Sequence, residues 1–410
     1  MIEYIEKLLN GRSVEWKTLE QTFEIRNGYT PSKSNPDFWE GGSIPWYRME
    51  DLRCNGGLLK DSIQHITLCA IKGKGLFEAG SIIMATTATI GEHALLIADS
   101  LANQRFTNFS IRKSLKNNLL PKYVYYYFFI IDDWCKRNVD VSSFPSVKMG
   151  ELKQQLFPIP PLSVQSEIVR ILDKFTALEA ELEEKLGIEL ECRRKQYGYY
   201  KGQMFDSLSC PTKHITDIAV VKARVGWQRL TKSEYMHTGD YFLVTGTDFK
   251  NGYIDFNNCV YVSKERYEMD SNIIVGKGDI LITKDGTLGK VAFVTESPNK
   301  PTTLNSGIFR IHVTDKDILP RYLFHYFTSK YFTDFVESVK TGSTIPHLTQ
   351  QGLTSLNIPI PSIEEQLRIV RILDRFTELE AELEERLGME LELRRKQYEY
   401  YRERLLSFDR

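Results

Sequence analysis

The sequence predicts an α+β protein with two mixed α/β domains, each followed by a long helix. The two helices are expected to pack as an antiparallel coiled coil with pseudo-two-fold symmetry. Three observations carry this prediction: a long segment recurs 201 residues later, leucines recur at helical spacing in both copies, and glycine-bounded apolar runs lie upstream of each copy. A chain of 410 residues is long enough for two such domains.

The repeat is the strongest signal. Residues 165–200 and 366–401 share the stretches IVRILD, EAELEE and RRKQY. Weaker echoes relate 79–99 to 277–297, 120–129 to 319–328, and 141–161 to 341–361. A period near 200 residues indicates duplicated domains rather than a solenoid. We expect domains at 1–162 and 209–361 and helices at 163–208 and 362–410, with one scaffold facing two different ligands.

Both repeated segments are predicted to be helices because apolar residues recur on one face. Prolines precede each segment, and Ser163 or Ser362 can cap the first turn. At 1.5 Å per residue each helix is roughly 65–70 Å long. On a single helix this apolar stripe would remain exposed to water, so we expect the other copy to cover it. The predicted packing residues are Phe175, Leu178, Leu182, Leu186 and Leu190 with Phe376, Leu379, Leu383, Leu387 and Leu391.

Two glycines, Gly187 and Gly388, occupy equivalent places near the middle of these helices. A glycine inside a helix costs about 1 kcal/mol relative to alanine. We expect the glycines to allow close approach where the helices cross; the alternative is a tolerated kink.

The globular regions are predicted to mix strands and helices. The runs GSIIMATTA and GDILITKDG are typical of strands that lead into turns. Aromatic-rich runs around 122–131 and 321–335 indicate buried helices. We expect a compact sheet with flanking helices in each domain.

Composition argues for a cytosolic protein. The N-terminal residues lack the pattern of a secretory signal, and no apolar stretch is long enough to span a membrane. Six cysteines form no CxxC pair and the histidines do not cluster, so neither a metal site nor a disulfide framework is expected. The net charge of −1 averages unlike parts, because residues 163–208 and 362–410 together contribute −5. The rest of the chain carries +4, which permits DNA binding without requiring it.

The usual catalytic motifs are missing from the sequence. The Gly-Lys pairs lack the leading glycine of a phosphate-binding loop, and no G-x-G-x-x-G or G-x-S-x-G motif occurs. No Asn-Pro-Pro or Asp-Pro-Pro run of the kind used by amino-group methyltransferases is present. These observations favour a binding role over catalysis.

Several motifs, in their order along the chain, resemble one known family. They are IPWYRMEDL (44–52), GDILITKDGTLGKVAF (278–293), GSTIPHLTQQGLTSLNIPIPS (342–362) and the two helices that contain IVRILD. In this order and duplication the chain resembles the specificity subunit of type I restriction-modification systems, over essentially its whole length. The first half departs from the pattern, because SSFPSVK stands where the second has GSTIPHL.

The resemblance implies a non-catalytic subunit with two target recognition domains, each reading one half of a split site in double-stranded DNA. The helices would fix the unread gap and dock two methyltransferase subunits, and restriction subunits would complete the enzyme. S-adenosylmethionine, ATP and magnesium would bind those partners, and none is expected in this chain. An alternative class is a protein-interaction scaffold that holds other proteins. An enzyme with an unrecognised site is the third interpretation.

Specific DNA reading needs side chains that reach base edges and phosphates. The expected set is Arg26, Tyr29, Lys33, Arg48, Lys72, Lys74, Gln104 and Arg105 in the first half, and Lys222, Arg224, Trp227, Arg229, Lys232, Lys284, Lys290 and His347 in the second. For each one the alternative is an ordinary solvated side chain. Trp46 and Tyr47 are expected in the core. For the basic triplets 193–195 and 394–396 we favour a solvated or ion-paired state over DNA contact.

Overall fold

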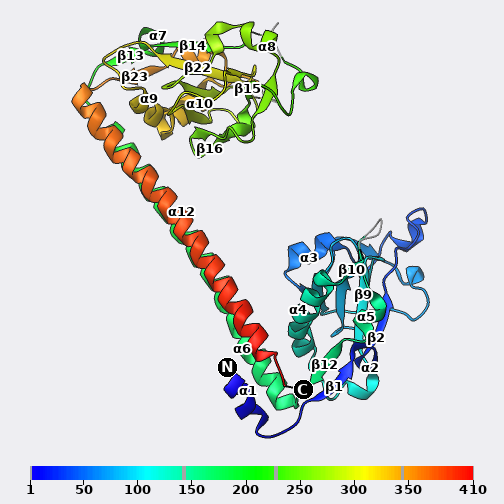
Figure 1. Ribbon diagram of the computed structural model, residues 1–410. Helices are drawn as coiled ribbons and strands as arrows, with labels where there is room; N and C mark the ends of the chain where they lie inside the picture. Colours follow the sequence, from blue (N-terminus) through cyan, green and yellow to red (C-terminus); the bar gives the residue numbers. More distant parts are fainter. Residues whose placement is uncertain (1, 141–144, 226–229, 343–345, 410) are drawn as a thin grey trace. The chain divides into compact units, whose positions relative to one another are not determined.

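Residues 2–140, 145–225, 230–342 and 346–409 are described in this computed structural model (Figure 1). The chain divides into two compact units: unit 1 comprises Met1–Lys185 and Gly388–Arg410, and unit 2 comprises Leu186–Leu387. The boundaries lie inside the two long helices, α6 (Leu162–Asp206) and α12 (Ile363–Leu405). Each unit therefore contains one globular domain and part of both long helices.

Unit 1 holds a five-stranded sheet of order β2-β9-β6-β7-β4 and a three-stranded sheet of order β5-β3-β8. The strands of these sheets are β2 (Phe23–Asn27), β3 (Ile44–Tyr47), β4 (Leu58–Leu59), β5 (His65–Ile66), β6 (Ile82–Ala85), β7 (His93–Leu96), β8 (Leu101–Ala102) and β9 (Phe106–Ile111). Two short pairs join β1 (Glu15–Thr18) to β12 (Leu156–Ile159) and β10 (Val139–Asp140) to β11 (Ser146–Val147). The helices are α1 (Ile2–Leu9), α2 (Leu19–Thr22), α3 (Met49–Asn55), α4 (Pro121–Arg137) and α5 (Met149–Lys153), with short 3-10 turns at Pro36–Phe38, Leu68–Ala70 and Lys113–Leu115.

Unit 2 has a related arrangement, with sheets of order β14-β22-β19-β20 and β18-β15-β21 and the pairs β13-β23 and β16-β17. Its strands are β13 (Thr212–His214), β14 (Ala219–Ala223), β15 (Tyr241–Val244), β16 (Phe249–Lys250), β17 (Tyr253–Ile254), β18 (Val260–Val262), β19 (Ile280–Thr283), β20 (Val291–Phe293), β21 (Thr302–Leu304), β22 (Ile308–Val313) and β23 (Asn357–Pro359). Its helices are α7 (Ile215–Ile218), α8 (Lys264–Glu268), α9 (Pro320–Phe327), α10 (Lys330–Val339) and α11 (Gln350–Thr354), with 3-10 turns at Lys232–Glu234, Gly246–Asp248 and Ser271–Ile273.

The two domains share their pairing pattern, which confirms the predicted duplication of an α/β scaffold. In unit 1 β6 pairs antiparallel with β9 and β7, and in unit 2 β19 pairs antiparallel with β22 and β20. The parallel pair β3-β8 corresponds to β15-β21. The glycine-bounded runs predicted as strands form β6 and β19, and the aromatic runs form α4, α9 and α10.

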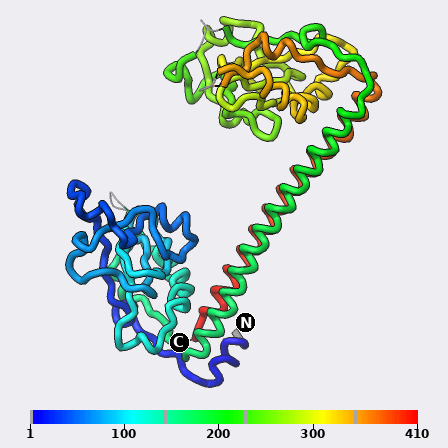
Figure 2. The backbone as a smooth tube through the Cα atoms, turned by 180° about the vertical axis from the view of Figure 1, so that it is seen from behind, coloured from blue at the N-terminus to red at the C-terminus, as the bar shows by residue number. Residues whose placement is uncertain are grey.

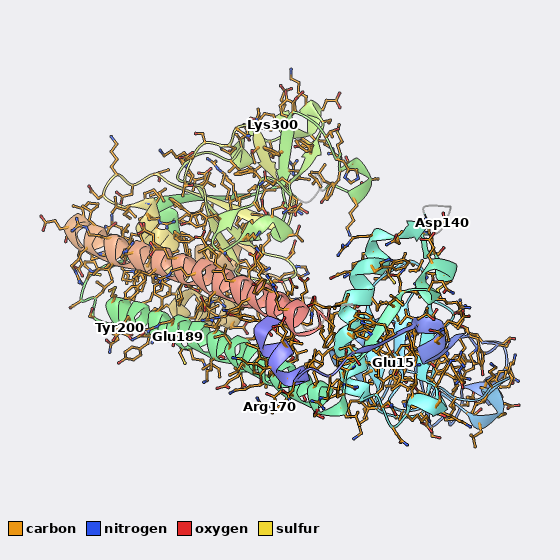
Figure 3. All side chains as sticks on the ribbon, turned by 60° about the horizontal axis from the view of Figure 1, so that its bottom comes forward. Glu15, Asp140, Arg170, Glu189, Tyr200 and Lys300 are labelled. Atoms are coloured by element: carbon orange, nitrogen blue, oxygen red, sulfur yellow. The ribbon has the colours of Figure 1, made fainter. Side chains whose placement is uncertain are left out.

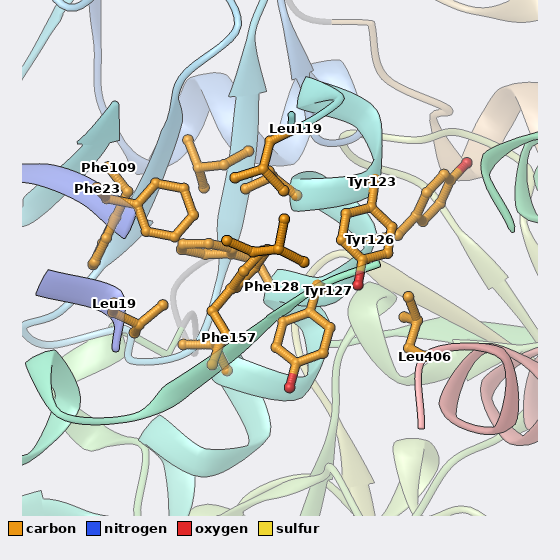
Figure 4. Close-up of a cluster of buried hydrophobic side chains, with 14 of the residues drawn as sticks. Leu19, Phe23, Phe109, Leu119, Tyr123, Tyr126, Tyr127, Phe128, Phe157 and Leu406 are labelled. Carbon is orange, nitrogen blue, oxygen red and sulfur yellow. The ribbon is translucent and has the colours of Figure 1, made fainter. Parts of the chain in front are cut away.

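Aromatic side chains fill the core of unit 1. Phe23 makes edge-to-face contacts with Phe109, Phe128 and Phe157, at centroid separations of 6.2, 5.6 and 5.2 Å. Figure 4 shows this cluster together with Leu406, the residue that directly follows α12. The apolar end of α12 therefore packs onto the domain that begins the chain.

The two long helices run antiparallel within unit 1. The Tyr398 hydroxyl lies 3.3 Å from that of Thr176, and the Arg395 guanidinium pairs with Glu179 at 3.1 Å. Because lower numbers on α6 meet higher numbers on α12, the helices point in opposite directions. The red end of the chain runs beside the first half of α6 in Figure 2.

Unit 2 repeats these contacts with the helices exchanged. The Tyr197 hydroxyl lies 3.4 Å from the Thr377 hydroxyl, and Arg194 pairs with Glu380 at 2.7 Å. The Tyr200 ring stacks on Phe376 with 6.2 Å between centroids. In unit 1 the Phe175 ring stacks on Tyr401 in the same way, with 5.6 Å between centroids. Each unit thus uses an equivalent aromatic contact and an arginine–glutamate pair to hold the two helices together, as expected for an antiparallel pair of duplicated helices.

The predicted leucine stripe is correct in part. Leu182, Leu186 and Leu190 are half-buried, as are Phe175 and the equivalent residues of α12. Leu178 and Leu379, however, are 49% and 44% exposed. A spacing of four residues advances about 40° past a full helical turn, so the first leucine of each run rotates away from the shared face. Glu179, half-buried beside Arg395, lies on the face instead.

The expected role of the helix glycines is not supported. A Cβ added at Gly187 or at Gly388 would meet no described atom within 4 Å. Both positions therefore have space for a side chain. We interpret these residues as glycines tolerated inside a helix and not as sites of close approach. α12 has the predicted serine cap, since Ser362 Oγ accepts from the Glu365 N–H at 3.4 Å. α6 begins at Leu162, which places Ser163 inside the first turn.

A buried glutamine fixes the start of each long helix. Gln165 donates to the carbonyls of Asn118 and Pro160, each at 2.7 Å, and accepts from the Leu120 N–H at 2.9 Å. Gln366 forms the equivalent bonds with Asp317 and Pro361 at 3.0 Å and Leu319 at 2.9 Å. Both side chains are fully buried. Each amide ties the loop before α4 or α9 to the proline turn before the long helix.

An aspartate on each long helix forms a hydrogen bond with a side chain of a domain helix, α4 in unit 1 and α9 in unit 2. Asp173 accepts from the Tyr126 hydroxyl at 2.6 Å in unit 1. In unit 2 His325 takes the place of this tyrosine, and its Nε2 lies 2.8 Å from Asp374. Burial lowers the pKa of His325 to about 4; the charges of Lys201 and Arg321 act in the same direction, and Asp374 opposes them.

Because of this histidine, we predict that the stability of unit 2 depends on pH. The folded pKa lies below the ordinary 6.5, so the unfolded chain takes up the proton first as pH falls. The stability that depends on neutral His325 is present above pH 6.5 and is lost between pH 6.5 and 4, by up to about 3 kcal/mol. His325→Tyr, which installs the residue found in unit 1, should reduce the loss. Urea unfolding at pH 7 and pH 4.5, followed by amide exchange in α9, measures it; equal losses in both proteins contradict this assignment.

Among the described residues, no helix is long and apolar enough to cross a membrane.

Candidate nucleic-acid interface

Three segments meet at one end of the main sheet in each domain. In unit 2 they are the turn after β19, the turn between β21 and β22, and the segment before α11. Lys284 N–H donates to the Gly307 carbonyl at 2.8 Å, and Leu348 N–H donates to the Lys284 carbonyl at 3.0 Å. Asn305 Oδ1 accepts from the Gly307 N–H at 2.8 Å and shapes the second turn. We call Asp285, Asn305, Ser306, Gly307 and His347 the tip of unit 2.

The same backbone bonds occur in unit 1. Thr86 N–H donates to the Arg105 carbonyl at 3.0 Å, and Val147 N–H donates to the Thr86 carbonyl at 2.9 Å. Asn103 Oδ1 accepts from the Arg105 N–H at 3.0 Å. The equivalent positions, which we call the tip of unit 1, are Thr87, Asn103, Gln104, Arg105 and Ser146. The backbone at the two tips is therefore the same and only the asparagine is kept among the side chains.

The tip of unit 2 borders an open cavity of about 520 Å³. His347 Nδ1 lies 2.6 Å from Asp285 Oδ1, and both side chains are exposed. The cavity is lined by Leu230, Thr231, Lys232, Tyr235, Gly246, Asp285, Asn305, Ser306 and Gly307. Its walls thus combine a carboxylate, an amide, hydroxyls and an ammonium group, the kinds of side chain that form hydrogen bonds to base edges and phosphates.

Most of the predicted DNA-contacting residues are exposed on their own domain. They are Lys33, Lys72, Lys74, Gln104 and Arg105 in unit 1, and Lys222, Lys232, Lys290 and His347 in unit 2. The structure brings Gln104 and Arg105 together at the tip of unit 1. In unit 2 it places His347 at the tip and Lys232 in the wall of the adjoining cavity. For the other exposed residues of this set, DNA contact stays a prediction. Trp227 and Arg229 lie outside the described residues, as do Ser343 and Thr344, which shortly precede His347.

Two predicted DNA contacts in unit 1 instead hold a loop to the sheet. Arg26 donates to the Gly75 carbonyl at 3.0 Å and to the Leu76 carbonyl, and its guanidinium lies 4.7 Å from the Phe77 ring centroid. The Tyr29 hydroxyl donates to the Ala70 carbonyl at 3.0 Å. Partial burial lowers the pKa of Arg26. We therefore assign these side chains a structural role.

Arg224 also differs from its prediction. The side chain is 2% exposed and donates to the Leu304 carbonyl at 2.9 Å and to Thr303 Oγ1 at 3.0 Å. A guanidinium buried in this way cannot reach a base or a phosphate, so it is structural. Arg48 is half-buried and pairs with Glu50 at 2.8 Å, and Lys284 is half-buried over the Phe309 ring at 5.4 Å.

The core and helix predictions near these sites are confirmed. Trp46 and Tyr47 are buried. The basic triplets of the helices form ion pairs with glutamates: Arg193 pairs with Glu189 at 2.8 Å, and Arg394 pairs with Glu390 at 2.9 Å. Figure 3 shows Glu189 along α6. These arginines therefore form ion pairs in the structure.

The sequence prediction missed seven of the ten tip residues: Thr87, Asn103 and Ser146 in unit 1, and Asp285, Asn305, Ser306 and Gly307 in unit 2. The repeat itself contained the signal, because Asn103-Gln104-Arg105 aligns with Asn305-Ser306-Gly307 at nearly the same offset as the neighbouring echoes. The predicted set contained basic, amide and aromatic residues and no carboxylate, so Asp285 was not among them. Among the described residues, no group of three or more histidine, cysteine or acidic side chains could hold a metal ion.

Comparison with known proteins identifies the family. A model of the type I restriction modification DNA specificity domain matches residues 12–192 and again 212–393. The type I restriction enzyme EcoprrI specificity subunit of Escherichia coli is 35% identical over 394 residues, covering 92% of this chain and 91% of that subunit. The EcoR124I/EcoR124II specificity subunit of Escherichia coli is 29% identical over 424 residues, covering 99% and 97%.

A solved structure shows the same fold. The chain superposes on one from a study of complex assembly and conformational transition in the type I restriction-modification system, with a TM-score of 0.65 and 16% identity. The match covers 97% of this chain and 99% of the other. Taken with the twofold match to the family model and the duplicated domains, these findings show that the chain belongs to the family of type I restriction-modification DNA specificity subunits.

Proposed function

We propose that this specificity subunit reads a bipartite DNA target, one half with the target recognition domain of each unit. The observation that carries the proposal is the pair of tips, which share backbone hydrogen bonds but differ in their outward side chains. A duplicated scaffold with unlike reading residues suits two unlike half-sites. The long helices fix the separation between the half-sites, and the subunit itself performs no catalytic step.

The helices also dock two methyltransferase subunits in this proposal. Equivalent apolar side chains are exposed on both repeats: Leu178 and Leu379, and Ile188 and Met389. In unit 2 a groove of about 320 Å³ runs along the helix pair and is lined by Phe376, Leu379 and Leu383 among others. Two copies of one surface suit two copies of one partner. Restriction subunits complete the enzyme, and S-adenosylmethionine, ATP and magnesium bind the partners.

A binding selection tests this function against the scaffold alternative. The complex of this chain with its methyltransferase subunits is incubated with duplexes that contain random bases and is washed at increasing salt. We expect enrichment of two short fixed motifs at one spacing, with affinity that falls steeply as salt rises because phosphate contacts release counterions. Recovery of no motif from the assembled complex would favour the scaffold alternative.

A further inference from the structure

We propose that the two tips read chemically opposite base edges, with Arg105 donating to a guanine and Asp285 accepting from the amino group of a cytosine or an adenine. The inference rests on the proposed function and assigns residues within it. It starts from the three-segment junction that both units share, where position-by-position comparison is possible.

The two tips carry opposite charges, and each charged residue corresponds to a neutral residue in the other unit. The turn before β9 places Arg105 where the turn before β22 has Gly307, and the turn after β6 places Thr87 where that after β19 has Asp285. The third segment contributes Ser146 in unit 1 and His347 in unit 2. Ser146 forms a backbone bridge with Thr87, and His347 forms one with Asp285. Unit 1 therefore presents a cation and two hydroxyls, whereas unit 2 presents a carboxylate and an imidazole.

The carboxylate of Asp285 is held in place yet keeps an acceptor available. His347 Nδ1 engages Oδ1 at 2.6 Å, and no other described residue forms a hydrogen bond with Oδ2. A Cβ added at Gly307 would lie 3.6 Å from Oδ2 and 3.6 Å from the Asp285 Cβ. The missing side chain at Gly307 thus leaves room beside the carboxylate, in the position where unit 1 has its arginine.

A carboxylate facing DNA needs a specific partner, because phosphates repel it and a base acceptor would repel it too. The exposed donors in the major groove are the amino groups of cytosine N4 and adenine N6, and aspartate accepts from them. Guanine O6 and thymine O4 are acceptors and are rejected. Asp285 therefore selects an amino base at one position of its half-site.

Arg105 has the opposite chemistry. Its side chain is exposed, and among the residues that the structure describes none forms a hydrogen bond or ion pair with its guanidinium. A free guanidinium fork matches the paired acceptors N7 and O6 of guanine. Gln104 lies next to it and adds an amide. Arg105 therefore selects guanine at one position of the other half-site.

Reciprocal substitutions in the full methyltransferase complex test this assignment. Asp285→Asn and Arg105→Gln are each compared with wild type by binding selection on random duplexes. We expect Asp285→Asn to lower discrimination between amino and keto bases at one position of one half-site, by about ten-fold or more, with the other half-site unchanged. Arg105→Gln should lower the preference for guanine over the other bases by a similar factor, at one position of the opposite half-site.

Two exposed residues that belong to neither tip provide matched controls: Asp334→Asn in unit 2 and Arg53→Gln in unit 1 should leave every base preference unchanged. In each variant the untouched half-site reports that the complex is still assembled, and amide exchange in β19 and β22 reports that unit 2 is folded. If Asp285→Asn leaves every base preference as in wild type, or weakens all positions alike, the assignment is wrong while the proposed function stands. If wild type itself selects no motif, both the function and the assignment fail.

Discussion

Inserting one heptad into each long helix should lengthen the accepted gap by about three base pairs and leave both half-site sequences unchanged. The equivalent insertion points are between Lys185 and Leu186 in α6 and between Arg386 and Leu387 in α12. A second copy of LEAELEE, which both helices already contain at residues 178–184 and 379–385, supplies the insert. Seven residues of helix add roughly 10 Å, and DNA rises by roughly 3.4 Å per base pair.

A heptad is chosen because it preserves the shared face of the helices. The half-buried leucines continue in phase, so the pairs Arg395–Glu179 in unit 1 and Arg194–Glu380 in unit 2 keep their partners. Binding selection with spacers of different length measures the result, and wild type is the control. The same preferred gap in both proteins would contradict a separation set by the helices.

The second large effect is expected from the buried glutamines. Gln366→Ala removes an amide that bonds three backbone groups and leaves the Leu319 N–H without its acceptor in the protein interior. An unsatisfied buried group costs about 1–3 kcal/mol, and more than one group is affected here. We expect unit 2 to lose about 3 kcal/mol of stability. Amide exchange in α9 measures the loss.

The duplicated design supplies the control for this prediction. Gln165→Ala should destabilise unit 1 by a similar amount and leave α9 protected, because its bonds lie wholly in unit 1. Gln196→Ala, at an exposed position of α6, should change little. If loss of Gln366 leaves exchange in α9 unaltered, the glutamine does not hold the domain to its helix.

The architecture was predictable because it depends on patterns that repeat. Identity between the two copies revealed the duplication, and helical spacing revealed the long helices. The same pattern misplaced Leu178 and Leu379, because a run of leucines at every fourth residue drifts around a helix with 3.6 residues per turn. Only the alternation of three- and four-residue steps keeps a side chain on the shared face.

The reading residues were less predictable, since charge alone does not reveal burial. Arg224 and Lys222 are close in sequence, yet one is buried against β21 and the other is exposed on β14. Residues two apart in a strand share a face, so strand alternation does not separate them. Arg224 lies just beyond the end of β14 (Ala219–Ala223), and its burial is evident only in the folded domain. Asp285 was missed for a different reason: an acidic residue opposes phosphate, and its use for a base amino group becomes evident only at the assembled tip.

The central claim is that this chain chooses which bases its partners methylate. Genome-wide mapping of methylated bases, in cells that express the methyltransferase subunit with and without this chain, tests that claim most directly. We predict modification at one two-part motif of fixed spacing, present only when the chain is expressed. Methylation at the same positions without the chain, or at positions with no common sequence when it is present, would contradict it.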